Sequence, residues 1–142
     1  MIKKLNSSNT SELFKLDNSI FEFDKYSLNQ IKEELENSSR LYLGYYDSDN
    51  LIGYVGASIT LDESDIIKIG VDVNFRNKGI ATKLFSALKQ ELVRLKVTKI
   101  MLEVREKNKN AISFYLKNGF LKIATRKNYY NNDNAIILML EI

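Results

Sequence analysis

The sequence predicts an α+β fold built on a mixed, mostly antiparallel sheet of about six to seven strands with about four helices. Three observations lead to this class. Residues Leu41 to Val73 alternate between apolar and polar in three runs separated by short Ser, Asp and Asn turns, which is typical of an antiparallel meander. A long helical pattern then precedes another strand, which predicts one β–α–β crossover. Two helical patterns precede the meander and one follows the crossover.

In chain order, Met1–Leu5 is predicted to be a short strand, and helices are expected where apolar residues recur every three or four positions, at Asn9–Phe21 and Ser27–Asn37. Ser27 and Gln30 form a capping box that starts the second helix. Apolar alternation predicts the meander strands at Leu41–Tyr46, Leu51–Leu61 and Ile66–Val73, with turns at Ser48–Asn50 and Asp62–Asp65.

The second half begins with a helix whose apolar face comprises Ile80, Leu84, Leu88, Leu92 and Leu95. A strand at Lys99–Arg105 and a helix at Ala111–Lys117 follow, with Asn108 or Asn110 as the N-cap. Asn118–Gly119 ends that helix as a left-handed cap does. The last strands are expected at Phe120–Arg126 and Ala135–Ile142, joined through RKNYYNNDN.

Length and composition are those of one soluble domain covering residues 1–142, with 44% apolar and 27% charged residues. No apolar run is long enough to span a membrane, and the N-terminus has no apolar signal region, so a cytoplasmic protein is expected. The net charge is +3 and the lysines are spread along the chain. This pattern favours a solvated surface over a nucleic-acid footprint, and it also suits a polyanionic cofactor or an acidic partner.

The chain contains no cysteine and no histidine. A thiolate nucleophile, a serine–histidine–carboxylate triad and the usual zinc ligands are therefore excluded, and no metal is expected. Acid–base chemistry must rest on carboxylates, tyrosines, lysines, a bound water or the chain's own amine.

The stretch VDVNFRNKGIATKLF turns from a strand into a helix through Arg76, Gly79 and Ala81. The first turn of a helix has unpaired N–H groups and a dipole that favours an anion, and a glycine lets a ligand approach the backbone. The paired glycines of a Walker loop and the GxGxxG pattern are both missing. From the residues alone, an anion site and a simple strand–helix turn are equally good interpretations.

Downstream, KIMLEVREKNKNAISFYLKNGF carries two further candidates. Glu103 interrupts an apolar strand, so it needs either an ion-pair partner or a catalytic task. Tyr115 lies on the apolar side of the next helix, where the pattern alone fits a simple core residue.

Together these stretches resemble the GNAT-type N-acetyltransferases. Arg76, Gly79 and Ala81 match that family's acyl-CoA-binding pattern Q/R-x-x-G-x-G/A. LEVREKNKNAISFYLKNGF and RKNYYNNDNAIILMLEI are similar to the later parts of one branch, the bacterial ribosomal-protein-alanine N-acetyltransferases (RimI type).

The resemblance implies a GNAT fold, acetyl-CoA as acetyl donor, Glu103 as general base and Tyr115 as general acid. It also implies a donor site that includes Ile69, Gly70, Val71, Arg76, Asn77, Lys78, Gly79, Ile80, Ala81, Thr82 and Asn108. Tyr129 and Tyr130 would contact the acceptor, or else form an aromatic pair that packs a hairpin. The family's Pro-Trp pair between its first two helices is missing from FEFDKYS, so the shape of the acceptor groove differs here.

The expected reaction is direct acetyl transfer, in a ternary complex, to the N-terminal amine of a protein, and the branch implies the N-terminal alanine of a small-subunit ribosomal protein. An α-amino group with a pKa of about 8 loses its proton more readily at neutral pH than a lysine with a pKa of about 10.4. A lysine, a polyamine, an aminoacyl-tRNA or a drug amine are the alternative acceptors. A CoA-binding module without turnover is the alternative from another class. Neither a membrane nor direct nucleic-acid binding is expected.

Overall fold

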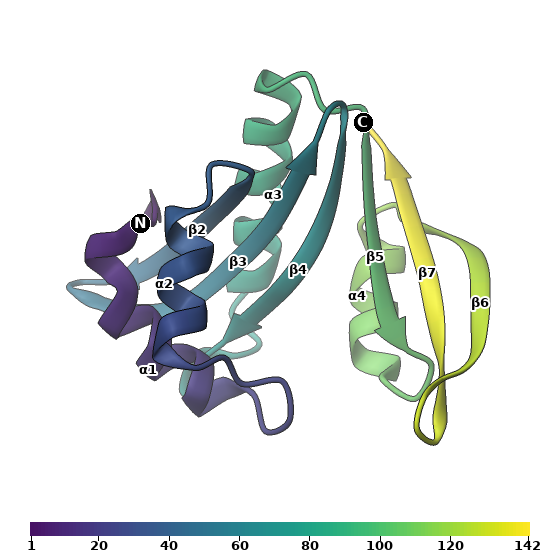
Figure 1. Ribbon diagram of the computed structural model, residues 1–142, viewed down its shortest axis with the longest axis horizontal. Helices are drawn as coiled ribbons and strands as arrows, with labels where there is room; N and C mark the ends of the chain where they lie inside the picture. The colour runs from purple at the N-terminus through teal and green to yellow at the C-terminus, as the bar shows by residue number, and fades with distance from the viewer.

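The computed structural model describes residues 1–142 and has the predicted α+β architecture, with one seven-stranded mixed sheet in the order β1-β2-β3-β4-β5-β7-β6 (Figure 1). The strands are β1 (Ile2–Lys4), β2 (Arg40–Asp47), β3 (Asn50–Thr60), β4 (Glu63–Val71), β5 (Lys99–Arg105), β6 (Leu121–Tyr130) and β7 (Asp133–Glu141). The helices are α1 (Thr10–Ile20), α2 (Leu28–Glu36), α3 (Ile80–Arg94) and α4 (Lys109–Lys117), with 3-10 turns η1 (Ser7–Asn9) and η2 (Val73–Phe75).

Two hydrophobic cores lie on opposite faces of the meander. Residues of a strand point alternately to either face, so Leu41 and Leu43 join the core under α3, while Tyr42 joins a second core under α1 and α2. The larger core continues under α4 through Tyr115 and Phe120. Helices therefore cover both faces of the meander. The larger core, on the face covered by α3 and α4, extends across both halves of the sheet.

The sheet opens between β4 and β5. These strands are parallel neighbours only where Glu63–Asp65 faces Lys99–Met101. Just beyond, the β3–β4 register shifts, because Ala57 faces Ile66 and Gly56 faces Lys68, which leaves Ile67 as an extra residue on β4. A bulge of this kind bends its strand, and Figure 1 shows β4 and β5 diverging like the arms of a V.

The β6–β7 hairpin differs from the expectation. RKNYYNNDN was expected to be a connection, but β6 continues to Tyr130 and β7 begins at Asp133, so Tyr129 and Tyr130 end a strand. The strand continues because Tyr130 pairs with Asp133, after a register irregularity that places Asn128 at φ 54. The polar end of β6 shows no apolar alternation, so the sequence pattern does not predict it and it is recognised only from its hydrogen-bonded pairing with β7.

The meander boundaries also shift. β4 starts at Glu63, inside the expected turn, and ends at Val71, with η2 in place of its last expected residues. The left-handed cap of α4 is confirmed, with Gly119 at φ 95. No helix is both long and apolar enough to cross a bilayer.

Candidate active site

The strand–helix corner and α4 enclose a cavity of about 590 Å³, here called the corner cavity. Ten of the residues expected at the donor site line it: Ile69, Gly70, Val71, Arg76, Asn77, Gly79, Ile80, Ala81, Thr82 and Asn108. Lys78 is not among the lining residues, and its ammonium lies 5.3 Å from the centre of the Phe75 ring. The expected donor residues are therefore brought together around one space, with this single exception.

The corner exposes backbone rather than side chains to this cavity. Gly79 is the N-cap of α3 with φ 78, and no side chain caps the helix. The first N–H groups of α3 are consequently left without side-chain acceptors. A Cβ built on Gly79 would meet nothing within 4 Å, so the space beside this backbone is open. A helix N-terminus of this form attracts a phosphate-bearing ligand.

Arg76 braces the corner, since its Nε–H donates to the carbonyl oxygen of Val71 at 3.0 Å. This contact ties the start of the corner to the end of β4. Beside it, the edge of Ile69–Val71 that faces β5 has no partner strand, because the β4–β5 ladder stops at Asp65. Such an open edge can hydrogen-bond an extended ligand as a further strand would.

A second space, the cleft cavity, has a volume of about 390 Å³ and lies between the diverging strands. Its lining comes from the α1–α2 loop, β4, β5, α4 and the end of β6, and it includes Glu103, Tyr115 and Tyr130. Five residues line both cavities, namely Phe21, Ile69, Asn108, Ala111 and Tyr115. The two spaces therefore meet, and Tyr115 lies where they do.

Glu103 projects from β5 with its side chain 32% exposed. Its Oε1 forms an ion pair with Nη1 of Arg126 at 3.0 Å, so the ion-pair interpretation of this residue is observed. Its Oε2 has no partner within the protein, and the residue lines the cleft cavity. One carboxylate oxygen is thus fixed while the other is free to accept a proton.

Tyr115 is buried on α4, where its ring packs edge-on against Phe114 and Phe120 with centroids 5.3 Å apart. Its hydroxyl makes no hydrogen bond within the protein. Burial raises the pKa of this hydroxyl from the usual tyrosine value, because a phenolate would be poorly solvated there. The hydroxyl of Tyr115 therefore stays protonated at neutral pH, as the predicted role of general acid requires.

Asn108 caps α4, since its Oδ1 accepts the N–H of Ala111 at 3.2 Å. Tyr130 lines the cleft cavity and stacks under the guanidinium of Arg105 at 4.0 Å. Tyr129 is 54% exposed, packs edge-on against Tyr130 and lines neither the corner cavity nor the cleft cavity. The packing interpretation of the tyrosine pair is thus observed, and contact of either residue with an acceptor stays a prediction.

Of the residues that line the cleft cavity, Phe21, Asp24 and Tyr26 belong to the FEFDKYS segment that the sequence linked to the acceptor groove, although none was singled out, and Lys68 was missed entirely. Asp17, beneath them, is completely buried. A signal for Asp17 exists, because Leu13, Leu16 and Ile20 mark a helix face on which position 17 also falls. A carboxylate on a buried face implies a partner, but nothing local identifies that partner as Lys68.

Residues 8–120 match the model of the acetyltransferase (GNAT) family. The chain belongs to this family. The chain is 35% identical over 113 residues to a [ribosomal protein bS18]-alanine N-acetyltransferase of Haemophilus ducreyi, an alignment covering 75% of this chain and 78% of the relative.

Two solved structures place the acetyltransferase among known folds. The ribosomal-protein-S18-alanine N-acetyltransferase of Escherichia coli superposes with a TM-score of 0.92 at 25% identity, covering 100% of this chain and 93% of that one. PaiA N-acetyltransferase of Thermoplasma acidophilum, solved in complex with coenzyme A, gives 0.85 at 20% identity, covering 100% and 98%. The latter likeness concerns the fold alone.

The acetyltransferase takes its acetyl group from acetyl-CoA, as its family does. The corner cavity fits such a donor, because it combines unpaired helix N–H groups, open space beside Gly79 and a free strand edge. No group of three or more His, Cys, Asp or Glu side chains that could hold a metal ion is present.

Proposed function

We propose that this acetyltransferase modifies the α-amino group of a protein N-terminus, and specifically the N-terminal alanine of the small-subunit ribosomal protein bS18. The observation that carries the proposal is the junction of the two cavities, where a donor in one and an amine in the other meet at Tyr115. The sequence relationship to a bS18-alanine N-acetyltransferase supports the choice of acceptor.

The donor binds in the corner cavity. The N–H groups of Asn77 to Thr82 hold its pyrophosphate, and the free edge of Ile69, Gly70 and Val71 hydrogen-bonds its pantetheine arm. Asn108 contacts it from the α4 side. Acetyl-CoA supplies a thioester at the junction, whose sulfur departs as a thiolate.

Glu103 is the proton acceptor of the transfer, and Tyr115 is the proton donor. Glu103 accepts a proton from the incoming ammonium, directly or through a water, with the oxygen that Arg126 does not hold. Tyr115 donates its hydroxyl proton to the departing sulfur. The second proton, which the nitrogen loses as the tetrahedral intermediate collapses, returns to the Tyr115 oxygen directly or through a water, so the tyrosine ends the reaction protonated. Because burial disfavours the phenolate, donation accompanies cleavage of the carbon–sulfur bond rather than preceding it. With no cysteine to carry the acetyl group, transfer is direct.

A terminal amine suits this machinery better than a lysine. At neutral pH an α-amino group with a pKa of about 8 needs roughly 1.4 kcal/mol to become neutral, whereas a lysine with a pKa of about 10.4 needs roughly 4.6 kcal/mol. A site whose evident base is a single carboxylate therefore favours the α-amino group, which has the smaller free-energy cost of deprotonation.

The test presents acetyl-CoA together with a peptide beginning Ala-Arg, the same peptide with a blocked N-terminus, or free polyamines. Acetylation of the free N-terminus alone is the expected result, measured by mass spectrometry of the peptide. Modification of the blocked, lysine-containing peptide or of the polyamines instead would overturn the choice of acceptor. CoA binding without any acetylation would identify a module without turnover.

A further inference from the structure

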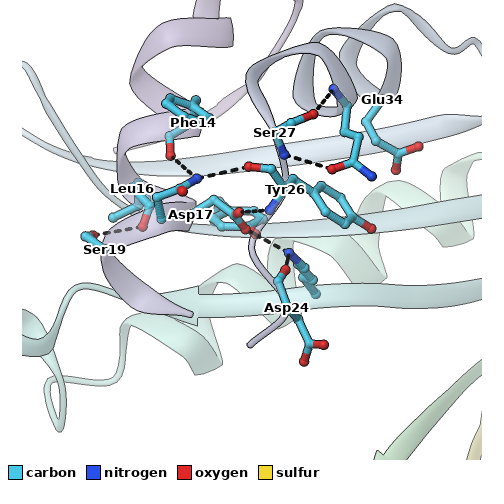
Figure 2. A network of polar contacts seen from close by, with 12 residues as sticks. Phe14, Leu16, Asp17, Ser19, Asp24, Tyr26, Ser27 and Glu34 are labelled. Carbon is cyan, nitrogen blue, oxygen red and sulfur yellow. Dashed lines mark hydrogen bonds and ion pairs between the residues drawn. The ribbon is translucent and has the colours of Figure 1, made fainter. Parts of the chain in front are cut away.

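The carboxylate of Asp17 is the most deeply buried charged group of the molecule and takes no part in the proposed chemistry. It lies on α1 with no exposed surface. Its Oδ1 accepts the hydroxyl of Tyr54 at 2.5 Å, and its Oδ2 accepts the N–H of Tyr26 at 2.8 Å, as Figure 2 shows for the latter. Asp17 therefore connects β3 with the loop that leads into α2.

Lys68 completes the arrangement from β4. Its ammonium forms an ion pair with Oδ1 of Asp17 at 3.0 Å and also donates to the carbonyl oxygen of Asp24. The same ammonium lies 3.6 Å from the centre of the Tyr26 ring and 4.8 Å from that of Phe21. Only 8% of the Lys68 side chain is exposed. Every contact of this ammonium except the ion pair is with the α1–α2 loop.

The segment held in this way is the loop Phe21–Tyr26, which forms one wall of the cleft cavity. Phe21, Asp24 and Tyr26 line that cavity together with Glu103. The loop has no regular helix or strand and contains no proline, so its own sequence supplies little stiffness. Its fixed position comes from side chains on α1 and β4: Asp17 and Lys68, and also Asn18, whose Nδ2 donates to the carbonyl oxygen of Tyr26 at 3.0 Å.

Energetics favour a positional role over a stabilising one. Taking two charges out of water costs roughly what their attraction returns, so a buried ion pair adds little net stability. The pair nevertheless restricts the positions of both side chains, because each buried charge must stay within contact distance of the other. The close packing of α1 on β4, where a Cβ on Gly70 would come within 3.1 Å of the Phe21 ring, leaves the loop little alternative space.

We propose that the Asp17–Lys68 pair is a positioning device that holds the Phe21–Tyr26 loop as the acceptor-side wall of the cleft cavity. This inference rests on the proposed function, in which the cleft cavity receives the acceptor amine. Neither residue touches the reacting atoms. Their effect is to present a preformed wall, so that the acceptor does not have to order the loop when it binds.

The test is the double variant Asp17→Asn, Lys68→Met, which removes both charges while keeping similar volumes. An asparagine can still accept the N–H of Tyr26 and donate to the hydroxyl of Tyr54, so no buried charge is left unpaired. The loop loses only its ties to the ammonium. We expect KM for the acceptor peptide to rise about tenfold, the factor for a loop that is correctly placed roughly one tenth of the time.

A matched control is Glu34→Gln, Arg40→Met. That carboxylate also accepts a tyrosine hydroxyl, from Tyr42 at 2.7 Å, and pairs with a cation, but it joins α2 to β2 and makes no hydrogen bond to the loop. The control should leave both KM values within about twofold of the parent protein. The Asp17 and Lys68 variant should likewise leave KM for acetyl-CoA within about twofold, because Phe21 is the one residue of the loop that also lines the corner cavity.

Hydrogen exchange supplies a readout that does not depend on turnover. In the double variant the amide of Tyr26, the one amide among residues 22–26 that donates a hydrogen bond, should exchange faster as the loop loosens, while those of α3 and β5 keep their protection. An unchanged acceptor KM with unchanged exchange would overturn the inference, and so would equal losses for both substrates. If the parent protein acetylates no peptide at all, the proposed acceptor is wrong, and the exchange of the Tyr26 amide still decides whether the pair holds the loop.

Discussion

The two cavities that meet at Tyr115 are built in different ways. Most of the corner cavity comes from one continuous stretch, Ile69 to Thr82, and it offers backbone groups and empty space to its ligand. The cleft cavity gathers side chains from the α1–α2 loop, β4, β5, α4 and β6. Backbone binding depends on the path of the chain and tolerates changes of side chain. Side-chain binding depends on which residues are present and on what holds them in place.

The largest effect is expected in the cleft cavity, at its candidate base. Glu103→Gln keeps the size of the side chain but removes proton acceptance, so kcat should fall about 10²- to 10⁴-fold. CoA affinity, measured by calorimetry, should stay within about twofold, because Glu103 does not line the corner cavity. Arg126→Met is the matched control, since it removes the ion pair and leaves the carboxylate. Equal losses of turnover and CoA affinity in Glu103→Gln would make the residue structural.

Tyr115→Phe tests the residue common to both cavities. A phenylalanine retains the packing against Phe114 and Phe120, so the melting temperature should not change. The loss of the donated proton should lower kcat about 10²-fold. Steady-state kinetics combined with a thermal melt would check this pair of expectations. A variant with full kcat would show that another group protonates the departing thiolate.

Gly79→Ala sharpens the claim that the corner cavity works through its backbone. The added Cβ meets no protein atom within 4 Å, so any steric loss must come from the ligand. The left-handed φ of 78 costs an alanine about 1 kcal/mol, and CoA affinity should fall about tenfold. Gly119→Ala is the control, because φ there is also positive at 95. That variant should lose stability while CoA affinity, measured by calorimetry, stays as in the parent protein.

As the pH is raised, binding of the acceptor should weaken before binding of acetyl-CoA does. Tyr42, Tyr46 and Tyr54 each donate a hydroxyl proton to a carboxylate on α1 or α2, and burial, aided by these bonds, raises their pKa values. The folded state then holds protons that the unfolded state releases near pH 10, so this stability is present below about pH 10 and is lost as the pH rises further.

The measurement is a series of thermal melts between pH 7 and 11, together with the KM values of both substrates. The melting temperature should fall above about pH 10, and the acceptor KM should rise at lower pH than that for acetyl-CoA. A melting temperature independent of pH to 11 would contradict the expectation.

The smallest effect is expected at Lys78. Its ammonium lies over the Phe75 ring and the residue does not line the corner cavity, so Lys78→Ala should change CoA affinity by less than about threefold, as for an exposed charge. A loss greater than about tenfold by calorimetry would mean that this side chain contacts the donor directly.

Much of the fold follows from local pattern. The meander, the long α3 and the capping box at Ser27 are confirmed, because their signals lie within a few residues of one another. The end of β6 could not be predicted, since Tyr129 and Tyr130 stay in a strand through pairing with β7 rather than through apolar alternation. The bulge at Ile67, which opens the sheet, likewise exists only in the register between β3 and β4.

The sequence by itself determined the family and the strand–helix corner, whose motif and open helix terminus come from one contiguous stretch with a largely local conformation. Only the tertiary structure decided how the cleft cavity is built. It brought Lys68 to Asp17, which lies 51 residues earlier, and set the FEFDKYS loop in the lining of one cavity together with Glu103. The physical reason is that a buried charge requires a partner, whereas the identity of that partner depends on which strands lie side by side.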